Sequence, residues 1–251
     1  MNASTAPTID LTGRIILITG AAGSLGQVAA KALAGAGAQL ILLDKSAPGL
    51  ERLSDEIAAA GDPLPALYPL DYLEATEADY DTLAGIIEQQ FGALHGLIHC
   101  AGDLGTLQPV NEIKASTWQT LLLINLTAPF LLTRALFPIL SHSHATIAFT
   151  SDSSARGNKP YWSAYGVAKN ALEGLVQMWA DEQENVGTVR MGLFIPGPTR
   201  SAIRRKSHPG ELLEALPPVE TLGPSYVRLM TPGSEPPAEF LVLPHKHPES
   251  V

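Results

Sequence analysis

Residues 14–26 read Arg-Ile-Ile-Leu-Ile-Thr-Gly-Ala-Ala-Gly-Ser-Leu-Gly, and this stretch decides the fold class. Its apolar first half stops at Gly20, which is typical of a short buried strand. Apolar residues then recur at helical spacing until Gly35 and Gly37, which end the helix. A strand, a glycine-rich turn and a helix in this order predict the first unit of a doubly wound α/β sheet.

The same alternation continues along the chain. Further strands are predicted at 39–43, 66–70, 96–100, 146–150 and 189–195, and further helices at 50–61, 77–91, 116–140 and 162–184. The helix at 116–140 is expected to bend near Pro129. Because the strands carry few charges, we expect a parallel sheet covered by helices on both faces.

After Pro196 the alternation gives way to a proline-rich region, with a last candidate strand at 240–243. The chain has no internal repeat and no long linker that would divide it. We therefore expect one Rossmann-like domain over residues 1–251, with about seven strands.

Composition excludes several classes of function. With 45% hydrophobic and 16% charged residues, the 251-residue chain is expected to bury a sizeable core. A net charge of −9 argues against nucleic-acid binding, because phosphate contacts need clustered Lys and Arg. No stretch approaches the roughly 18 uninterrupted apolar residues of a membrane span. The single cysteine, Cys100, excludes an intrachain disulfide, and residues 1–13 lack a signal peptide pattern, so a cytoplasmic protein is expected.

The turn from Thr19 to Gly26 is a candidate nucleotide site. Small residues let the backbone approach a dinucleotide pyrophosphate, and the following helix supplies N–H donors and a positive dipole end. The alternative is a turn that merely packs tightly, because glycine-rich turns alone are a weak signal.

Asp44 ends the second predicted strand, about twenty residues beyond this turn. A carboxylate there accepts hydrogen bonds from the adenosine ribose hydroxyls and repels a 2′-phosphate, which favours NAD over NADP. The alternative is an Asp that caps the following helix. The neighbouring Lys45 would soften the discrimination, so NADP stays open.

Tyr165 and Lys169 are four residues apart, on one face of the predicted helix. A tyrosine hydroxyl near a carbonyl can donate the proton that a developing alkoxide needs. Its pKa must then fall by roughly 3 units, about 4 kcal/mol, and an adjacent ammonium supplies part of this. The pair alone is common on helix surfaces, but with the turn, Asp44 and the strand–helix alternation it indicates a catalytic site.

In these features the chain resembles the short-chain dehydrogenase/reductase family over nearly its whole length. The resemblance is carried by the 19–26 turn, Asp71, Ala101-Gly102, Asn125, Tyr165, Lys169 and Pro196-Gly197. In detail it is similar to the YciK-type subgroup of bacterial members, in residues 101–105, Trp118 and residues 196–200.

The resemblance implies a role for each matching residue. Tyr165 would be the general acid/base, Lys169 would bind the nicotinamide ribose, and Asn125 would hold a proton-relaying water. Asp71 would contact the adenine and Thr199 the carboxamide. The remaining implied cofactor contacts are Gly20, Gly23, Ser24, Leu25, Gly26, Tyr72, Ala101, Gly102 and Pro196. The family also implies a substrate lid within about 200–235, and a homodimer or homotetramer built on helices 116–140 and 162–184.

Three positions depart from the family pattern. Ser24 stands where glycine is usual, and the spacing Gly20, Gly23, Gly26 is similar to that of nucleotide-sugar epimerases. Cys100 replaces an asparagine and is expected to be buried and structural. Asp152 occupies the position of the catalytic serine, thirteen residues before Tyr165.

Asp152 is the departure that bears on activity. An ionised carboxylate beside Tyr165 would raise the tyrosine pKa and repel a developing oxyanion. Either Asp152 is held neutral and donates a hydrogen bond, or Ser153 takes the serine's role, or the site is inactive.

Other charged and aromatic residues form less specific patterns. Arg200, Arg204, Arg205 and Lys206 suggest a lid for an anionic substrate or, alternatively, a solvated cluster. The pairs His142/His144 and His245/His247 lack further ligands, so no metal site is expected. Trp118 and Trp162 are expected to be packing residues, with Trp162 near the pocket mouth.

Three functions remain open from the sequence. The first is an NAD(P)(H)-dependent oxidoreductase that interconverts an alcohol and a carbonyl of a small-molecule substrate, carried by Tyr165, Lys169, Asn125 and Asp152. The second is a catalytically impaired protein that binds or senses NAD(H). The third is epimerase or lyase chemistry on a nucleotide sugar, suggested only by the glycine spacing.

Overall fold

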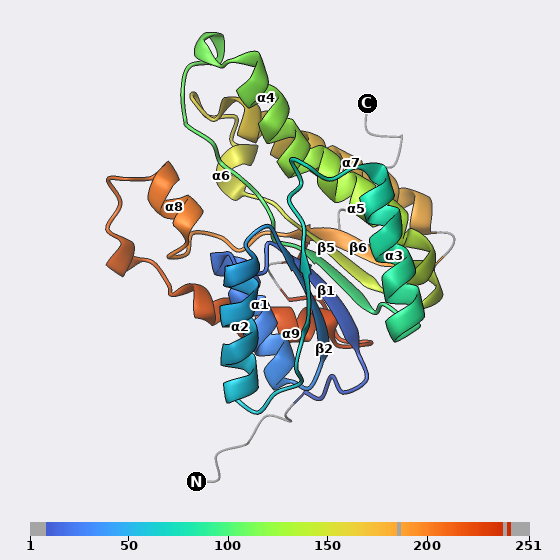
Figure 1. Ribbon diagram of the computed structural model, residues 1–251. Helices are drawn as coiled ribbons and strands as arrows, with labels where there is room; N and C mark the ends of the chain where they lie inside the picture. Colours follow the sequence, from blue (N-terminus) through green and yellow to red (C-terminus); the bar gives the residue numbers. More distant parts are fainter. Residues whose placement is uncertain (1–8, 185–186, 238–239, 242–251) are drawn as a thin grey trace.

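The computed structural model describes residues 9–184, 187–237 and 240–241, which form one α/β domain (Figure 1). A seven-stranded sheet lies at its centre in the order β3-β2-β1-β4-β5-β6-β7. The strands are β1 Ile15–Thr19, β2 Gln39–Asp44, β3 Ala66–Pro69, β4 Gly96–His99, β5 Thr146–Thr150, β6 Arg190–Phe194 and β7 Phe240–Leu241. The predicted doubly wound sheet with about seven strands is confirmed.

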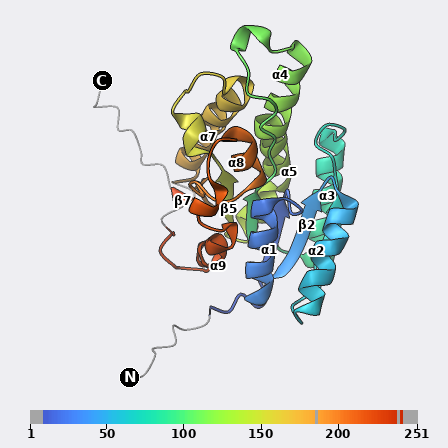
Figure 2. The ribbon, with the colours of Figure 1, turned by 90° about the vertical axis from the view of Figure 1, so that its left-hand side faces the viewer.

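Two helical layers cover the sheet (Figure 2). Helices α1 (Ser24–Gly35), α2 (Ala47–Ala59) and α9 (Gly223–Met230) pack on one face, and α3 (Glu77–Phe91), α5 (Ala128–His142) and α7 (Ser163–Glu184) on the other. Each layer has its own core, because the buried strands present alternate side chains to opposite faces. The short helices are α4 Ala115–Leu122, α6 Ser153–Arg156 and α8 Ala202–Ser207, with 3-10 turns at Val110–Glu112, Leu213–Ala215 and Val219–Leu222.

The strand order places a crevice between β1 and β4. After β1 the chain adds β2 and β3 on one side, and it then returns to add β4, β5 and β6 on the other. The connections leave β1 and β4 in opposite directions, so the loops at their carboxyl ends diverge. This is the topological switch point at which open α/β sheets bind ligands.

The helical stretch at 115–142 is continuous but irregular. Helix α4 passes into a π-helical segment, Leu123–Thr127, and then into α5. The predicted irregularity near Pro129 therefore lies just before that proline, in a π-bulge that contains Asn125. By length and composition alone this is the one described helix able to span a bilayer. Its Leu132, Leu136 and Leu140 are fully buried against the sheet, as in the core helix of a globular domain.

Two parts of the C-terminal third differ from expectation. Strand β7 runs antiparallel to β6 rather than parallel, and residues 242–243 of the predicted strand lie outside the described residues. The range predicted for the lid, 200–235, is longer than the segment that borders the cavity. Within it only 201–204, 206 and 207 line the cavity described below. Helix α9 is instead a core element, with Tyr226 and Leu229 fully buried.

Candidate active site

A cavity of about 430 Å³ opens at the carboxyl ends of the six parallel strands. Every one of these strands contributes to it, because each is followed by a loop that turns over this edge of the sheet. The lining includes most residues predicted for the site: Gly20, Gly23, Ser24, Leu25, Asp44, Asp71, Tyr72, Ala101, Gly102, Asp152, Tyr165, Pro196 and Thr199. Gly26, Asn125 and Lys169 lie behind this lining.

The glycine-rich turn is packed too closely to accept side chains. A Cβ on Gly26 would lie 2.2 Å from the carbonyl oxygen of Gly20, and one on Gly20 would lie 2.5 Å from the Ala101 nitrogen. Gly20 also has a φ of +63°, which favours glycine. These contacts bring the first turn of α1 directly against β1 and β4.

The first turn of α1 is an open anion site. Its N-cap is Gly23, so no side chain caps the free N–H groups, and Gly23, Ser24 and Leu25 line the cavity. No acidic residue lies in this turn to oppose an anion. The chain therefore offers the backbone cradle that a dinucleotide pyrophosphate requires.

Asp44 joins this turn to the end of β2. Its Oδ2 accepts from the Ala22 N–H at 3.1 Å, and its Oδ1 accepts from the Ser46 N–H at 2.9 Å. Ser46 is the N-cap of α2, so this second contact lies at the start of that helix. The alternative that Asp44 has a structural role in the turn before α2 is therefore partly correct. Asp44 and Lys45 both line the cavity, side by side.

Tyr165 lies at the inner wall of the cavity and is 3% exposed. Its hydroxyl donates to Oδ2 of Asp152 at 3.2 Å. Burial raises the pKa of Tyr165 well above its ordinary value, and the Asp152 carboxylate raises it further by its charge and its hydrogen bond. The geometry thus favours the protonated tyrosine, the form that donates a proton.

Lys169 lies one turn further along α7 and is 5% exposed. Its ammonium donates to the Thr150 carbonyl at 2.9 Å and lies 5.8 Å from the centre of the Tyr165 ring. Burial lowers the pKa of Lys169 to about 8, against the opposing charge of Asp152. The ammonium lies beside the tyrosine ring on the same helix, as the spacing predicts. The predicted fall of the Tyr165 pKa is not seen, because burial and Asp152 raise it.

Asn125 is fully buried in the π-bulge between α4 and α5. Its Oδ1 accepts from the Asp103 N–H at 3.2 Å, and its Nδ2 donates to the carbonyls of Asp103 and Leu121 at 2.8 and 2.9 Å. These bonds attach the helix to the loop after β4. Asn125 therefore fixes the position of Gly102 and Asp103 at the cavity wall.

The end of β5 decides which side chain stands beside the tyrosine. Ser151 is 2% exposed and borders the cavity, but its Oγ donates to Glu173 at 2.5 Å. Asp152, the next residue, faces the cavity and accepts from Tyr165, whereas Ser153 is exposed at the start of α6. All three residues border the cavity, and the hydrogen bond from Tyr165 puts the Asp152 carboxylate in the serine's place.

Other predicted residues sit around the rim. Asp71 accepts from the Leu73 N–H through Oδ1, and Tyr72 is buried beneath the same loop. Thr199 is 5% exposed and borders the cavity. Cys100 is half-buried at the cavity floor, where burial raises the pKa of its thiol to about 11.

The structure adds lining residues that the sequence analysis missed. They include Leu43, Leu70, Ile124 and Thr150. These side chains are unremarkable in the sequence and come from β2, the residue after β3, the π-helical segment and β5. Trp162, as predicted, is a packing residue, because it is 6% exposed and its ring lies 5.9 Å from that of Tyr165.

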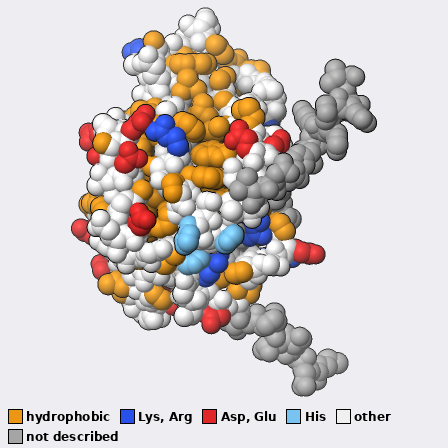
Figure 3. Space-filling model, turned by 90° about the vertical axis from the view of Figure 1, so that its right-hand side faces the viewer, with side chains coloured by type: hydrophobic (Ala, Val, Ile, Leu, Met, Phe, Trp, Pro, Cys, Tyr) orange, Lys and Arg blue, Asp and Glu red, His pale blue; other side chains and the backbone are white. Residues whose placement is uncertain are grey.

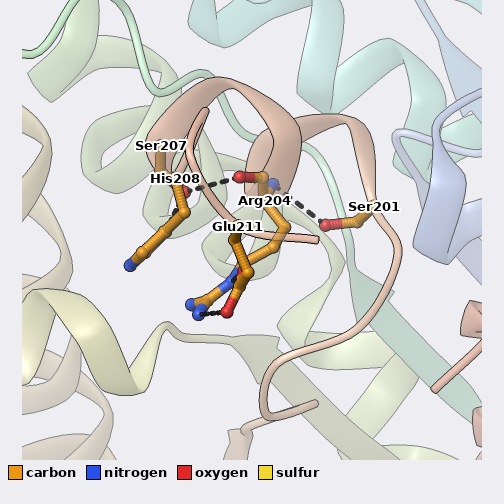
Figure 4. Close-up of polar contacts among 5 residues, drawn as sticks. All are labelled: Ser201, Arg204, Ser207, His208 and Glu211. Atoms are coloured by element: carbon orange, nitrogen blue, oxygen red, sulfur yellow. Dashed lines mark hydrogen bonds and ion pairs between the residues drawn. The ribbon is translucent and has the colours of Figure 1, made fainter. Parts of the chain in front are cut away.

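Residues 201–211, called the lid below, border one side of the cavity. Ser201 is the N-cap of helix α8, and its Oγ accepts from the Arg204 N–H (Figure 4). The Ala202 N–H donates to Oγ of Ser24 in the glycine-rich turn at 3.2 Å. Arg204 and Lys206 line the cavity. Arg200 instead donates to the carbonyls of Leu216 and Glu214, so the basic cluster of the sequence is divided between two roles.

No metal site is found among the residues that the structure describes, where no three His, Cys, Asp or Glu side chains group together. His142 and His144 lie at the end of α5, remote from the cavity lining. The second pair, His245 and His247, lies outside the described residues.

Comparison with known proteins gives consistent matches. A family model described as short chain dehydrogenase matches residues 14–212. The uncharacterized oxidoreductase YciK of Escherichia coli K12 is 36% identical over 221 residues, covering 88% of this chain and 87% of that protein. A structure from Pseudomonas syringae is 41% identical with a TM-score of 0.86, covering 92% and 94% of the two chains. A Shigella flexneri 2a structure, solved with NADP, is 36% identical with a TM-score of 0.84, covering 88% and 92%.

Proposed function

Because the chain belongs to the short-chain dehydrogenase family, we propose that it transfers a hydride between a nicotinamide cofactor and the carbonyl or alcohol group of a small molecule. The predicted resemblance, including the YciK-type subgroup, is confirmed by the matches above. One observation carries the proposed reaction. The Tyr165 hydroxyl and the glycine-rich turn border the same cavity, with the Lys169 ammonium beneath the tyrosine.

In this proposal Tyr165 supplies the proton and the chain positions the reactants. The cofactor, when bound, supplies the hydride. Tyr165 donates its proton to the substrate oxygen during reduction and accepts one during oxidation. Lys169 holds positive charge beneath the ring, which favours the tyrosinate that forms. Asn125 holds the loop at Asp103. Asp71 and Thr199, which line the cavity, would border the adenine and nicotinamide ends.

The proposal is tested by fluorescence titration of the purified protein with NADH and NADPH, followed by a screen of aldehydes, cyclic diketones and keto acids. We expect saturable binding below millimolar concentration, and oxidation of the bound cofactor by at least one carbonyl class. Failure of both nucleotides to bind would contradict the proposal at its first step. Cofactor that stays tightly bound through purification would favour the epimerase-type reaction instead.

Asp44 of this chain and the cofactor of a related structure point to different nicotinamide cofactors. Asp44 predicts NAD, but the Shigella flexneri relative was solved with NADP, so the NAD preference is not supported. We propose that the protein accepts NADP(H), with Lys45 aiding and Asp44 limiting the affinity for the 2′-phosphate.

Replacing Asp44→Asn is expected to improve NADPH binding relative to NADH by at least about tenfold, or 1.4 kcal/mol. The neutral amide no longer repels the 2′-phosphate but still accepts backbone hydrogen bonds through its oxygen. Parallel titrations with both nucleotides measure the ratio. Lys45→Met is the matched variant and should move the ratio the other way. If the ratio of NADPH to NADH affinity is unchanged in both variants, the 2′-phosphate does not bind beside Asp44 and Lys45.

A second candidate function is nucleotide binding without turnover. It is favoured by the contact of Asp152 with Tyr165, which holds the tyrosine pKa well above its ordinary value. Oxidation of an alcohol needs the tyrosinate, so the raised pKa confines it to high pH, whereas reduction uses the protonated form and persists at lower pH.

Asp152→Ser is expected to lower the pH at which alcohol oxidation is half-maximal by more than about one unit. Removing the carboxylate removes the charge that raises the Tyr165 pKa. Initial rates between pH 6 and 11 measure the change. Ser153→Ala is the control, because Ser153 also lines the cavity but Asp152 holds the contact with Tyr165. If the pH profile of alcohol oxidation changes in Ser153→Ala and not in Asp152→Ser, Ser153 has the serine's role.

We further propose a cytoplasmic homodimer or homotetramer that uses neither nucleic acid nor a membrane. Support comes from apolar side chains on α5 and α7: Met178 and Val167 are 60% and 46% exposed, and Phe137 packs on Trp179 beside them. Figure 3 shows apolar side chains gathered over this side of the molecule. Light scattering coupled to size-exclusion chromatography measures the assembly.

A further inference from the structure

The lid brings a cation to the cavity beside Asp152. Asp152 follows β5 and Arg204 lies on α8, fifty-two positions later, yet both side chains line the same cavity. The hydrogen bond to Glu211 raises the pKa of Arg204, and the Asp152 carboxylate raises it as well. The two opposite charges therefore act on each other within this cavity.

Arg204 is fixed in the plane of its ion pair. Its Nε donates to Oε2 of Glu211 at 2.6 Å, and its Nη2 donates to Oε1 at 2.7 Å (Figure 4). The Arg204 and Glu211 side chains are only 18% and 28% exposed. A two-point contact between a guanidinium and a carboxylate sets both distance and orientation, which a single ammonium contact does not.

Two neighbours of Arg204 on the lid, Ile203 and His208, pack near Tyr165. Ile203 packs against Leu104, Trp162 and Tyr165 in a small apolar cluster. On the other side of Arg204, the His208 ring lies 6.0 Å from the ring of Trp162. The lid is thus attached to the tyrosine's own surroundings on both sides of Arg204.

Four titratable groups surround Asp152 from the elements packed against it. Tyr165 and Lys169 face it from α7, and Arg204 and His208 interact with it from the lid. Lys169 is needed beneath the tyrosine, where it is already bonded to the Thr150 carbonyl. Arg204 is therefore the permanently charged group of the lid that lines the same cavity as the carboxylate.

We propose that Arg204 is a positioning residue that balances the charge of Asp152, so that the two form a matched pair in place of the family's serine. With its charge offset, Asp152 accepts the Tyr165 hydroxyl but repels a developing oxyanion less. The inference rests on the acid/base role proposed for Tyr165, and it gives the lid a part in the chemistry beyond covering the cavity.

Lys169 provides a test that needs no substrate, because the Asp152 carboxylate acts on its ammonium. The measurement is a pH titration of the full chain with 13C-labelled lysine, with the signal assigned through Lys169→Met. Arg204→Met leaves Asp152 unbalanced, and we expect it to raise the pKa of Lys169 from about 8 by about one unit. Arg204→Lys, which keeps the charge, should restore most of the original value.

Arg205→Met is the matched control, because Arg205 is exposed, adjacent in sequence and outside the cavity lining. It should leave the Lys169 titration unchanged. In an Asp152→Ser background, Arg204→Met should produce less than half of its original shift, since the partner charge is gone. The proposal is overturned if Arg204→Met behaves like Arg205→Met, or if its shift is the same with Ser at 152.

A second experiment, the measurement of kcat, distinguishes a failure of this inference from a failure of the proposed function. Arg204→Met should lower kcat for carbonyl reduction about tenfold, and less than about twofold in the Asp152→Ser background. If the Lys169 pKa shift depends on Asp152 but no variant turns over substrate, the charge pair is supported and the oxidoreductase function is refuted. Turnover with additive, uncoupled effects would support the oxidoreductase and refute the pair.

Discussion

Tyr165→Phe is expected to lower kcat for carbonyl reduction by about 10³-fold while leaving nucleotide affinity within about twofold of the wild type. The phenyl ring keeps the packing against Trp162 and Leu104 but removes the hydroxyl that donates the proton. Burial and Asp152 raise the pKa of Tyr165, so the hydroxyl is protonated at neutral pH, as reduction requires. Steady-state oxidation of NADPH or NADH with the substrate found in the screen measures the loss.

Tyr161→Phe is the control for this prediction. Tyr161 is 58% exposed and lies four residues before Tyr165, outside the cavity lining. Its loss of a hydroxyl should leave kcat unchanged. Full activity of Tyr165→Phe would remove the tyrosine from the reaction and assign the proton donation to another group. Nucleotide binding without turnover in the wild type would instead favour the second candidate function.

Gly26→Ala is expected to weaken NADPH and NADH binding by at least about 100-fold, or 2.7 kcal/mol. A Cβ at this position would lie 2.2 Å from the Gly20 carbonyl oxygen and 2.7 Å from the Ala21 Cα. These are backbone atoms, so the clash is relieved only if α1 moves away from β1, which opens the anion site at the first turn. The same movement should destabilise the fold by about 1–3 kcal/mol.

Gly85→Ala separates this effect from the general cost of adding a methyl group. Gly85 lies inside α3, and its added Cβ meets nothing within 4 Å. The substitution should stabilise the protein by about 0.5–1 kcal/mol, because alanine loses less backbone entropy in a helix. Nucleotide titration and thermal unfolding of both variants provide the comparison. Nearly unchanged binding in Gly26→Ala would mean that the pyrophosphate does not use the first turn of α1.

The two largest expected effects separate the site into a part for binding and a part for chemistry. Gly26 shapes the backbone at the switch point and touches no reacting atom in the proposal. Tyr165 acts on the substrate and leaves the nucleotide cradle unchanged. The balance of Asp152 by Arg204 would join the second part to the lid, a segment that also contacts the glycine-rich turn through Ser24.

The sequence by itself determined the features that rest on local spacing. The apolar run before Gly20, the turn and the helical period after it predict strand, turn and helix, because each pattern is set by residues a few positions apart. The placing of Tyr165 above Lys169 follows in the same way, since residues four apart share a helix face. Both expectations agree with the structure, in β1, α1 and α7.

Only the tertiary structure decided which side chains meet across the cavity. Ser151 turns to Glu173 and leaves Asp152 beside Tyr165, and Arg204 reaches the same cavity from the lid. Asn125 lies in a π-bulge that no local pattern predicts, and the direction of β7 follows from its pairing with β6. These contacts join segments tens of residues apart. They depend on how helices and loops pack over the sheet, a sum of many weak non-local interactions that leaves no periodic signal in the chain.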